Sequence, residues 1–234
     1  MIYSVSAIPS QPLLPGQASR RSLTKADAAY EEIRERILSC DLAPGSVIEQ
    51  ESLAAWLGSS TTPVREALRR LAAEQLVTLP AHSDARIASV SLEEFQELHT
   101  VRLGLETLAA GIAATKLTPG DVRHLRDLLV APESASDPVR DDRSGALHRA
   151  IYTASRNRTV IQILDSTWDR IGRYRVLLSR TGTAPSCRTR AHEVIIDALE
   201  RHDSDEASRL VQKHLEDTFR VILPAASEAL QQYA

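Results

Sequence analysis

The sequence predicts a mainly α-helical protein, with a small N-terminal domain and a larger C-terminal domain built from helices alone. Three observations lead to this fold class. Apolar residues recur at helical spacing through most of the chain, residues 77–79 and 86–90 read as short strands, and no convincing strand follows residue 90. The 234 residues, of which 43% are hydrophobic and 25% charged, suffice for two separate cores.

Residues 1–24 are expected to form a flexible tail. Regular structure is interrupted there four times, by Pro9, Pro12, Pro15 and Gly16. No basic start precedes an apolar core, so the segment does not resemble a signal peptide, and no run approaches the roughly 18 apolar residues of a membrane-spanning helix. The two cysteines, Cys40 and Cys187, form no CxxC pair, which is typical of a reducing compartment. We therefore expect a cytoplasmic protein that binds no membrane.

Two short amphipathic helices are predicted within residues 44–76. The first buries Leu53, Ala54 and Leu57 and ends at Gly58. The second carries an apolar stripe at 3.6-residue spacing, formed by Val64, Ala67, Leu68, Leu71 and Ala72. Two helices this short must pack against each other, so the segment predicts a helix-turn-helix unit.

The polar face of the second helix carries hydroxyl and guanidinium groups. These groups contact phosphates and base edges when a helix enters the DNA major groove. The candidate DNA-binding residues are Ser60, Thr61, Thr62, Arg65 and Arg69. The alternative is an ordinary helix pair whose arginines are merely solvated.

The flanking segments favour the DNA-binding interpretation. Ile33, Ile37 and Leu38 predict a preceding helix over residues 28–38, and the two short strands form a hairpin around a polar tip at residues 81–84. Three helices followed by a hairpin make a winged helix. We therefore predict a winged helix-turn-helix domain over residues 25–90.

This domain resembles the DNA-binding domain of GntR-family transcription factors over about residues 28–89. The resemblance rests on Pro44-Gly45, Leu53-Ala54, Leu57-Gly58 and Thr62-Pro63-Val64-Arg65-Glu66-Ala67-Leu68. It implies a DNA contact for Arg65, whereas Thr61 stands where the family usually has a base-contacting arginine. Cys40 and the tip at Ser83-Asp84 stand where glycine is usual. A non-glycine residue at positive φ costs about 1 kcal/mol, so we expect the local turn to differ.

Residues 91–234 predict an all-α bundle of about six helices. Ser91 and Glu94 form a capping box for a helix that runs to about residue 114, and Thr118-Pro119 opens the next helix. A Pro/Ser/Ala linker follows at residues 131–137. Four more helices are expected near residues 140–155, 159–178, 186–201 and 204–222, with Pro224 disturbing the last. Large bundles hold ligand sites between facing helices.

Three histidines lie on apolar faces of three different predicted helices. His148, His192 and His214 each have apolar neighbours three or four positions away. Imidazoles directed at one core from separate helices suggest convergence, and on the residues alone a metal site and satisfied core histidines are equally supported. The other histidines lack this pattern and are interpreted as surface residues, namely His82, His99, His124 and His202.

The bundle resembles the FCD effector domain of the FadR branch of the GntR family over about residues 92–215. The resemblance rests on Val101-Arg102-Leu103-Gly104-Leu105-Glu106, Leu147-His148-Arg149-Ala150, His192-Glu193 and His214-Leu215. Many FCD domains hold a divalent metal with three histidines and an aspartate one helical turn before the first. That position is Ser144 here. The resemblance implies a Zn²⁺, Ni²⁺ or Mn²⁺ site that is either weaker or completed by the effector's own carboxylate.

The effector implied by the resemblance is a small organic or sugar acid. Arg102 and Arg173 are the candidate residues for binding its carboxylate. Their alternative role is ion pairing, for which Arg102 has Glu106 four residues further on. If no metal is bound, the three histidines could bind the anionic effector directly.

These features predict a homodimeric transcriptional regulator, expected to be a repressor, on a pseudo-palindromic operator in double-stranded DNA. The net charge of −3 indicates a focused DNA contact rather than a broad basic face. One alternative is a metal-free FadR-like sensor of an acyl thioester, which Ser144 favours and the three histidines disfavour. The other is a helical metal-dependent hydrolase with a DNA-binding appendage. Glu193 adjoins His192 outside any HExxH motif, so no general base is recognisable and no enzyme is predicted.

Overall fold

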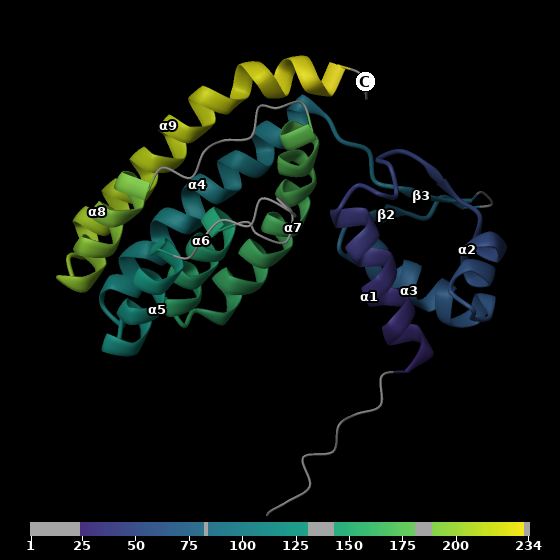
Figure 1. Ribbon diagram of the computed structural model, residues 1–234, viewed down its shortest axis with the longest axis horizontal. Helices are drawn as coiled ribbons and strands as arrows, with labels where there is room; N and C mark the ends of the chain where they lie inside the picture. Colours follow the sequence, from purple (N-terminus) through teal and green to yellow (C-terminus); the bar gives the residue numbers. More distant parts are fainter. Residues whose placement is uncertain (1–23, 82–83, 131–142, 181–188, 232–234) are drawn as a thin grey trace, which may run out of the picture.

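The computed structural model describes residues 24–81, 84–130, 143–180 and 189–231, and these are mainly helical, as predicted. Figure 1 shows a small N-terminal part and a larger helical part, which are joined by the segment between β3 and α4. Residues 1–23 of the predicted tail, together with His82, Ser83 and Cys187, lie outside the described residues.

The N-terminal part is a three-helix unit with a small sheet. Its elements are α1 (Lys25–Leu38), β1 (Val47–Ile48), α2 (Gln50–Trp56), α3 (Thr61–Ala73), β2 (Val77–Thr78) and β3 (Ala85–Ile87). The sheet has the order β1-β3-β2, and both pairs of strands are antiparallel. β1 was not predicted, because two residues with one buried side chain give no periodic pattern. The helices meet over fully buried Ile33, Ile37, Val64 and Leu68, so this part has a core of its own.

The predicted strand over residues 86–90 is longer than the observed one. β3 ends at Ile87, and the chain then leaves the sheet toward α4. The cause is Val90, which is 2% exposed and packs in the core of the helical part rather than in the sheet.

The turn after α1 adopts a left-handed conformation without a glycine. Cys40 has φ 56°, which costs about 1 kcal/mol for a residue with a side chain. Its side chain is buried in the core of the helical part, and its Sγ donates to the Arg173 carbonyl oxygen at 3.7 Å. Packing at the junction of the two parts therefore offsets the strain.

Six helices form the described helical part. They are α4 (Leu92–Ala114), α5 (Pro119–Val130), α6 (Arg143–Ala154), α7 (Arg158–Arg180), α8 (Thr189–Glu200) and α9 (Ser204–Leu230). The last helix was expected to end near residue 222, but α9 continues through Pro224 to Leu230. Burial of Ala226, Ala229 and Leu230 beyond the proline outweighs its cost of about 3 kcal/mol.

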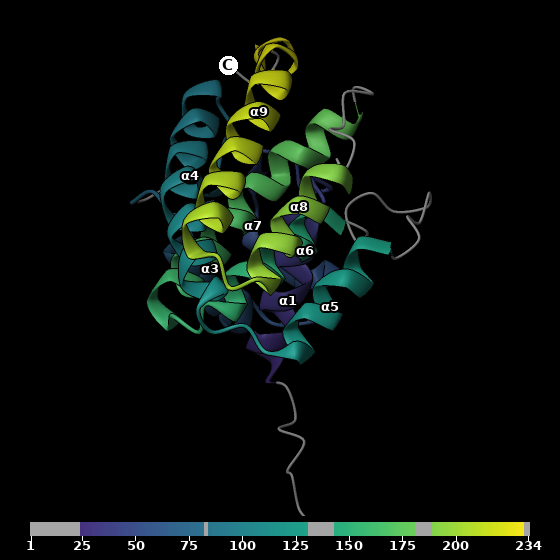
Figure 2. The same ribbon diagram turned by 90° about the vertical axis from the view of Figure 1, so that its left-hand side faces the viewer.

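Figures 1 and 2 show α9 lying alongside α4. Gly111 on α4 permits the close approach, because a Cβ there would lie 2.5 Å from the Ser208 Oγ and 3.2 Å from the Ser204 Oγ. Both serines donate across the contact, Ser204 to the Gly111 carbonyl oxygen at 3.0 Å and Ser208 to the Thr107 carbonyl oxygen at 3.2 Å. The C-terminal half of α4 is thereby fixed against the start of α9.

Replacing Gly111 with alanine should lower the free energy of unfolding. Overpacking costs about 1–3 kcal/mol, which exceeds the roughly 0.5–1 kcal/mol that alanine gains over glycine within a helix. Urea denaturation measures the difference. The matched control is Gly172→Ala on α7, where a Cβ would meet nothing within 4 Å and stability should rise slightly. Equal stabilisation by both substitutions would contradict a close α4–α9 crossing.

Candidate DNA-binding face and metal centre

Helix α3 separates a buried stripe from an exposed polar face. Val64, Ala67, Leu68 and Leu71 are fully buried, whereas Thr62, Arg65 and Arg69 are exposed and Thr61 is partly exposed. Ser60 is the N-cap residue, but its exposed side chain makes no capping hydrogen bond. All five candidate residues therefore lie on one accessible end and face of α3.

Arg70 differs from its neighbours on the same helix. Its Nη1 donates to Asp27 at 2.8 Å, and its guanidinium lies 4.0 Å from the centre of the Tyr30 ring. Arg65 stays on the exposed face, where its Nε donates to the Gln50 Oε1 at 3.3 Å. Arg70 therefore joins α3 to α1, while Arg65 and Arg69 face outward.

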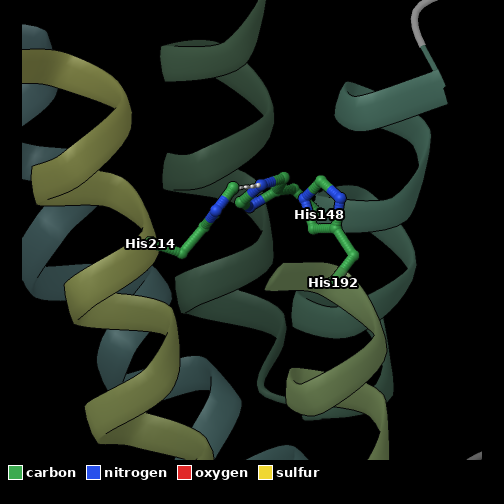
Figure 3. Close-up of side chains that lie close together, drawn as sticks. All are labelled: His148, His192 and His214. Carbon is green, nitrogen blue, oxygen red and sulfur yellow. Dashed lines mark hydrogen bonds between the residues drawn. The ribbon is translucent and has the colours of Figure 1, made fainter. Parts of the chain in front are cut away.

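The structure brings His148, His192 and His214 together from α6, α8 and α9 (Figure 3). One ring nitrogen from each lies within 4.8 Å of the others, and the Nε2 atoms of His148 and His214 are 3.2 Å apart. All three side chains are buried. Two nitrogens bound at about 2.1 Å to a tetrahedral metal lie roughly 3.4 Å apart, so this cluster fits a divalent ion after a small closure.

The environment favours neutral imidazoles, which is the form that binds metal. Burial lowers the pKa of His192 to about 3, with further contributions from His148 and the Arg175 cation. Burial likewise lowers the pKa of His214 to about 2, helped by the two neighbouring histidines and by Arg102. Lone pairs on these rings are thus available at neutral pH.

Glu106 contacts the histidine cluster as well as Arg102, although the sequence indicated it only as an ion-pair partner of Arg102. Its buried carboxylate accepts from the His148 Nδ1 at 2.6 Å and from the Arg102 Nε at 2.6 Å. Burial alone would raise the pKa of Glu106, but Arg102 and His148 outweigh it and lower the pKa to about 2. The bond from Nδ1 leaves the His148 Nε2 facing the other histidines.

The cluster forms one end of a pocket that is partly open to solvent. Ser144 lines this pocket one helical turn before His148, so a hydroxyl occupies the position for which the sequence resemblance implied an aspartate. The other polar lining residues are His99, Arg102, Arg175 and Thr218, and the main apolar ones are Phe95, Trp168, Ile171, Leu178, Phe219 and Ile222.

Of the two arginines expected to bind the effector's carboxylate, Arg102 lines the pocket and Arg173 does not. The Arg102 guanidinium lies 4.0 Å from the centre of the Trp168 ring. Arg173 is 0% exposed at the junction of the two parts, and its Nη1 donates to the Ala88 carbonyl oxygen at 2.8 Å.

The interpretation of His99 as a surface residue is wrong. Its ring lines the pocket and stacks on Phe219, with the ring centres 3.7 Å apart. Helical spacing could have indicated this, because Phe95, His99 and Arg102 share one face of α4. His124 and His202 are exposed, as expected.

Two family descriptions match the chain. Residues 25–83 match "Bacterial regulatory proteins, gntR family", and residues 97–217 match the FCD domain, which covers half of the chain. None of the described helices is both long and apolar enough to span a membrane.

Curated proteins similar to this chain are transcriptional regulators. The HTH-type transcriptional regulator McbR of Escherichia coli (strain K12) is 26% identical over 163 residues, which cover 68% of this chain and 74% of McbR. The HTH-type transcriptional repressor GlaR of the same organism is 26% identical over 206 residues, covering 83% of this chain and 93% of GlaR. The solved structure of E. coli McbR/YncC has a TM-score of 0.70 at 22% identity, covering 90% and 99% of the two chains. That likeness supports the fold.

The metal-free protein should lose stability as pH falls from about 6.5 to 4. Burial lowers the folded-state pKa of His99 to about 4, and His192 and His214 lie lower still, so the unfolded chain binds more protons in this range. Each histidine whose pKa is lowered this far should reduce the free energy of unfolding by roughly 1.5 kcal/mol between pH 6.5 and 5.

Urea denaturation with a chelator at several pH values measures this loss. His192→Gln should flatten the dependence, whereas His124→Gln on the exposed surface should leave it unchanged. An unaltered pH dependence in His192→Gln would show that this ring is not held neutral by the fold.

Proposed function

We propose, for a chain that belongs to the gntR family of bacterial regulatory proteins and carries an FCD domain, that a small carboxylate bound among the three histidines controls its affinity for operator DNA. The chain is a transcriptional regulator, as its relatives are, and not an enzyme. The observation that carries the proposal is the buried cluster of His148, His192 and His214 beside Arg102.

The three histidines would hold a divalent metal, Zn²⁺, Ni²⁺ or Mn²⁺, through their ring nitrogens. When bound, such an ion supplies a positive centre that attracts a carboxylate. Ser144 contributes no negative charge to this end of the pocket, so the carboxylate of the effector would supply the negative charge that the three histidines lack. Arg102, held by Glu106 at 2.6 Å, adds a second cation for the same carboxylate.

DNA binding is assigned to the exposed face of α3. Two copies of the chain, joined through their helical parts as a homodimer, would place two α3 helices on the half-sites of a pseudo-palindromic operator. Ser60, Thr61, Thr62, Arg65 and Arg69 are the contacts. One relative, GlaR, is named a transcriptional repressor, which supports repression as the role of this chain.

Helix α7 provides the link between the pocket and the DNA-binding part. Trp168, Ile171 and Leu178 line the pocket. On another face of the same helix, Asp169 pairs with Arg34 of α1, and the Arg180 Nη2 donates to the Ser39 carbonyl oxygen at 2.8 Å. An effector that binds one position of α7 better than another therefore shifts the winged helix and the spacing of the half-sites it fits.

Arg65→Ala should weaken operator binding. Loss of one base-contacting arginine costs about 1–3 kcal/mol, or roughly 5- to 150-fold in affinity. Fluorescence anisotropy with a duplex selected from a random pool measures it. Arg70→Ala is the matched control, because that side chain contacts Asp27 and Tyr30 and should leave affinity unchanged. Unaltered binding by Arg65→Ala would remove α3 from the interface.

The purified protein should contain about one divalent metal per chain. Elemental mass spectrometry should show its loss in His192→Ala and its retention in His124→Ala, an exposed position on α5. Ser144→Asp should raise metal affinity at least tenfold, since a carboxylate joins the three imidazoles. Unfolding curves confirm that each variant is folded. A protein that takes up no metal even after incubation with Zn²⁺ would rule out the site.

A further inference from the structure

The pocket is polar at one end and apolar at the other. α4 and α9 run antiparallel along it, since Gly111 meets Ser208 at one end and Phe95 meets Phe219 at the other, with ring centres 5.5 Å apart. His214 lies at the polar end, beside His148. Ile222, two turns further along α9, lies about 12 Å away by helical rise. The cavity is therefore elongated, and its chemistry changes along its length.

The cations of the pocket gather at the polar end. Arg102 and Arg175 lie 4.0 Å and 5.7 Å from the centre of the same Trp168 ring, which in turn lies 5.5 Å from the His148 ring. Nothing comparable occurs at the far end. There, the described lining residues are Phe95, His99, Leu178, Phe219 and Ile222, and none carries a charge at neutral pH because the pKa of His99 is lowered to about 4 by burial and by Arg102.

The change from a polar to an apolar lining determines which kind of acid the pocket can bind. Of the described lining residues at the far end, His99 alone carries polar side-chain atoms. A second carboxylate, or the several hydroxyls of a sugar acid, would therefore be buried there with too few hydrogen-bond partners, which is costly. A phenyl ring or an alkyl chain would instead be buried against Phe95, Phe219 and Ile222, with a gain for every methylene. Between the ends, the buried Thr218 Oγ1 has no hydrogen-bond partner among the described residues. It is therefore available to hydrogen-bond one polar substituent near the carboxylate.

We infer that the effector is a monocarboxylic acid with a medium-length aliphatic or an aromatic tail. Its carboxylate lies at the three histidines and Arg102, and its tail lies between α4, α7 and α9. This inference rests on the proposed function, because it takes the histidine end as the carboxylate site. It separates this chain's effector from the dicarboxylic and sugar acids that the polar end alone would also accept.

The test is calorimetric titration of the full-length, Zn²⁺-loaded protein with octanoate, phenylpropionate, acetate, adipate and gluconate. Octanoate and phenylpropionate should bind on the order of a hundredfold more tightly than acetate, and also more tightly than adipate and gluconate. The readout is heat of binding, with thermal unfolding as a second measurement, and neither depends on DNA.

Two variants locate the tail. Ile222→Gln places an amide at the apolar end and should lower octanoate affinity about tenfold, while metal content and the weak binding of acetate stay unchanged. Val221→Gln is the matched control, because Val221 is 60% exposed and does not line the pocket. Equal effects of the two substitutions would overturn the placement.

The outcomes separate this inference from the proposed function. Tighter binding of gluconate or adipate, lost in His192→Ala, would overturn the apolar-tail inference and support the carboxylate site. Octanoate binding that persists unchanged in both His192→Ala and Ile222→Gln would place the acid elsewhere and overturn the inference. Binding of octanoyl-coenzyme A without binding of octanoate would replace the free acid by a thioester. No bound metal and no bound acid would overturn the proposed function itself.

Discussion

The arrangement of the whole pocket depends on one buried carboxylate. Glu106 accepts from the His148 Nδ1 and the Arg102 Nε, both at 2.6 Å, so its charge is compensated on both sides. Loss of either partner would leave a buried charge at a cost of about 3–5 kcal/mol. Through His148, this carboxylate sets which nitrogen faces the other two histidines. Through Arg102, it sets the guanidinium above Trp168. The three histidines and Arg102, which are proposed to hold the metal and the carboxylate, are therefore positioned by the same side chain.

The second constraint is that α7 belongs to both functional parts. Its pocket face carries Trp168 and Leu178, and its other side holds the winged helix through Asp169 and Arg180. Cys40 adds to this junction, since its strained backbone places a buried side chain against the Arg173 carbonyl oxygen. Such a junction has few ways to move, because sliding of α7 displaces α1 directly. In the proposed mechanism, α7 alone would therefore connect the pocket to the winged helix.

Patterns within single helices were sufficient to predict which residues face solvent and which face the core. Helical spacing placed the exposed face of α3 and directed three histidines at one core, because both follow from 3.6 residues per turn. The Glu106–His148 bond joins positions 42 residues apart, so no local pattern could show it. Arg173 was expected in the pocket but lies at the junction of the two parts, where it donates to the Ala88 carbonyl oxygen. It is on a different face of α7 from Arg175, which does line the pocket. Proline disfavours the interior of a helix, but α9 continues past Pro224 because residues beyond it are buried against the rest of the helical part.

The length of the effector matters for signalling as well as for affinity. A short acid at the three histidines touches α7 near Trp168, at one end of the pocket. A longer acid also extends toward Leu178, which lies further along the same helix at the apolar end of the pocket. Because a ligand shifts a conformational equilibrium only through differential contacts, the longer acid has more contact with the element that moves. Leu178 lies two residues before Arg180, which holds the end of α1. In the proposed complex, an apolar tail would therefore act on α7 close to where the DNA-binding part is attached, whereas the carboxylate would act at the end of the pocket that Glu106 already restrains.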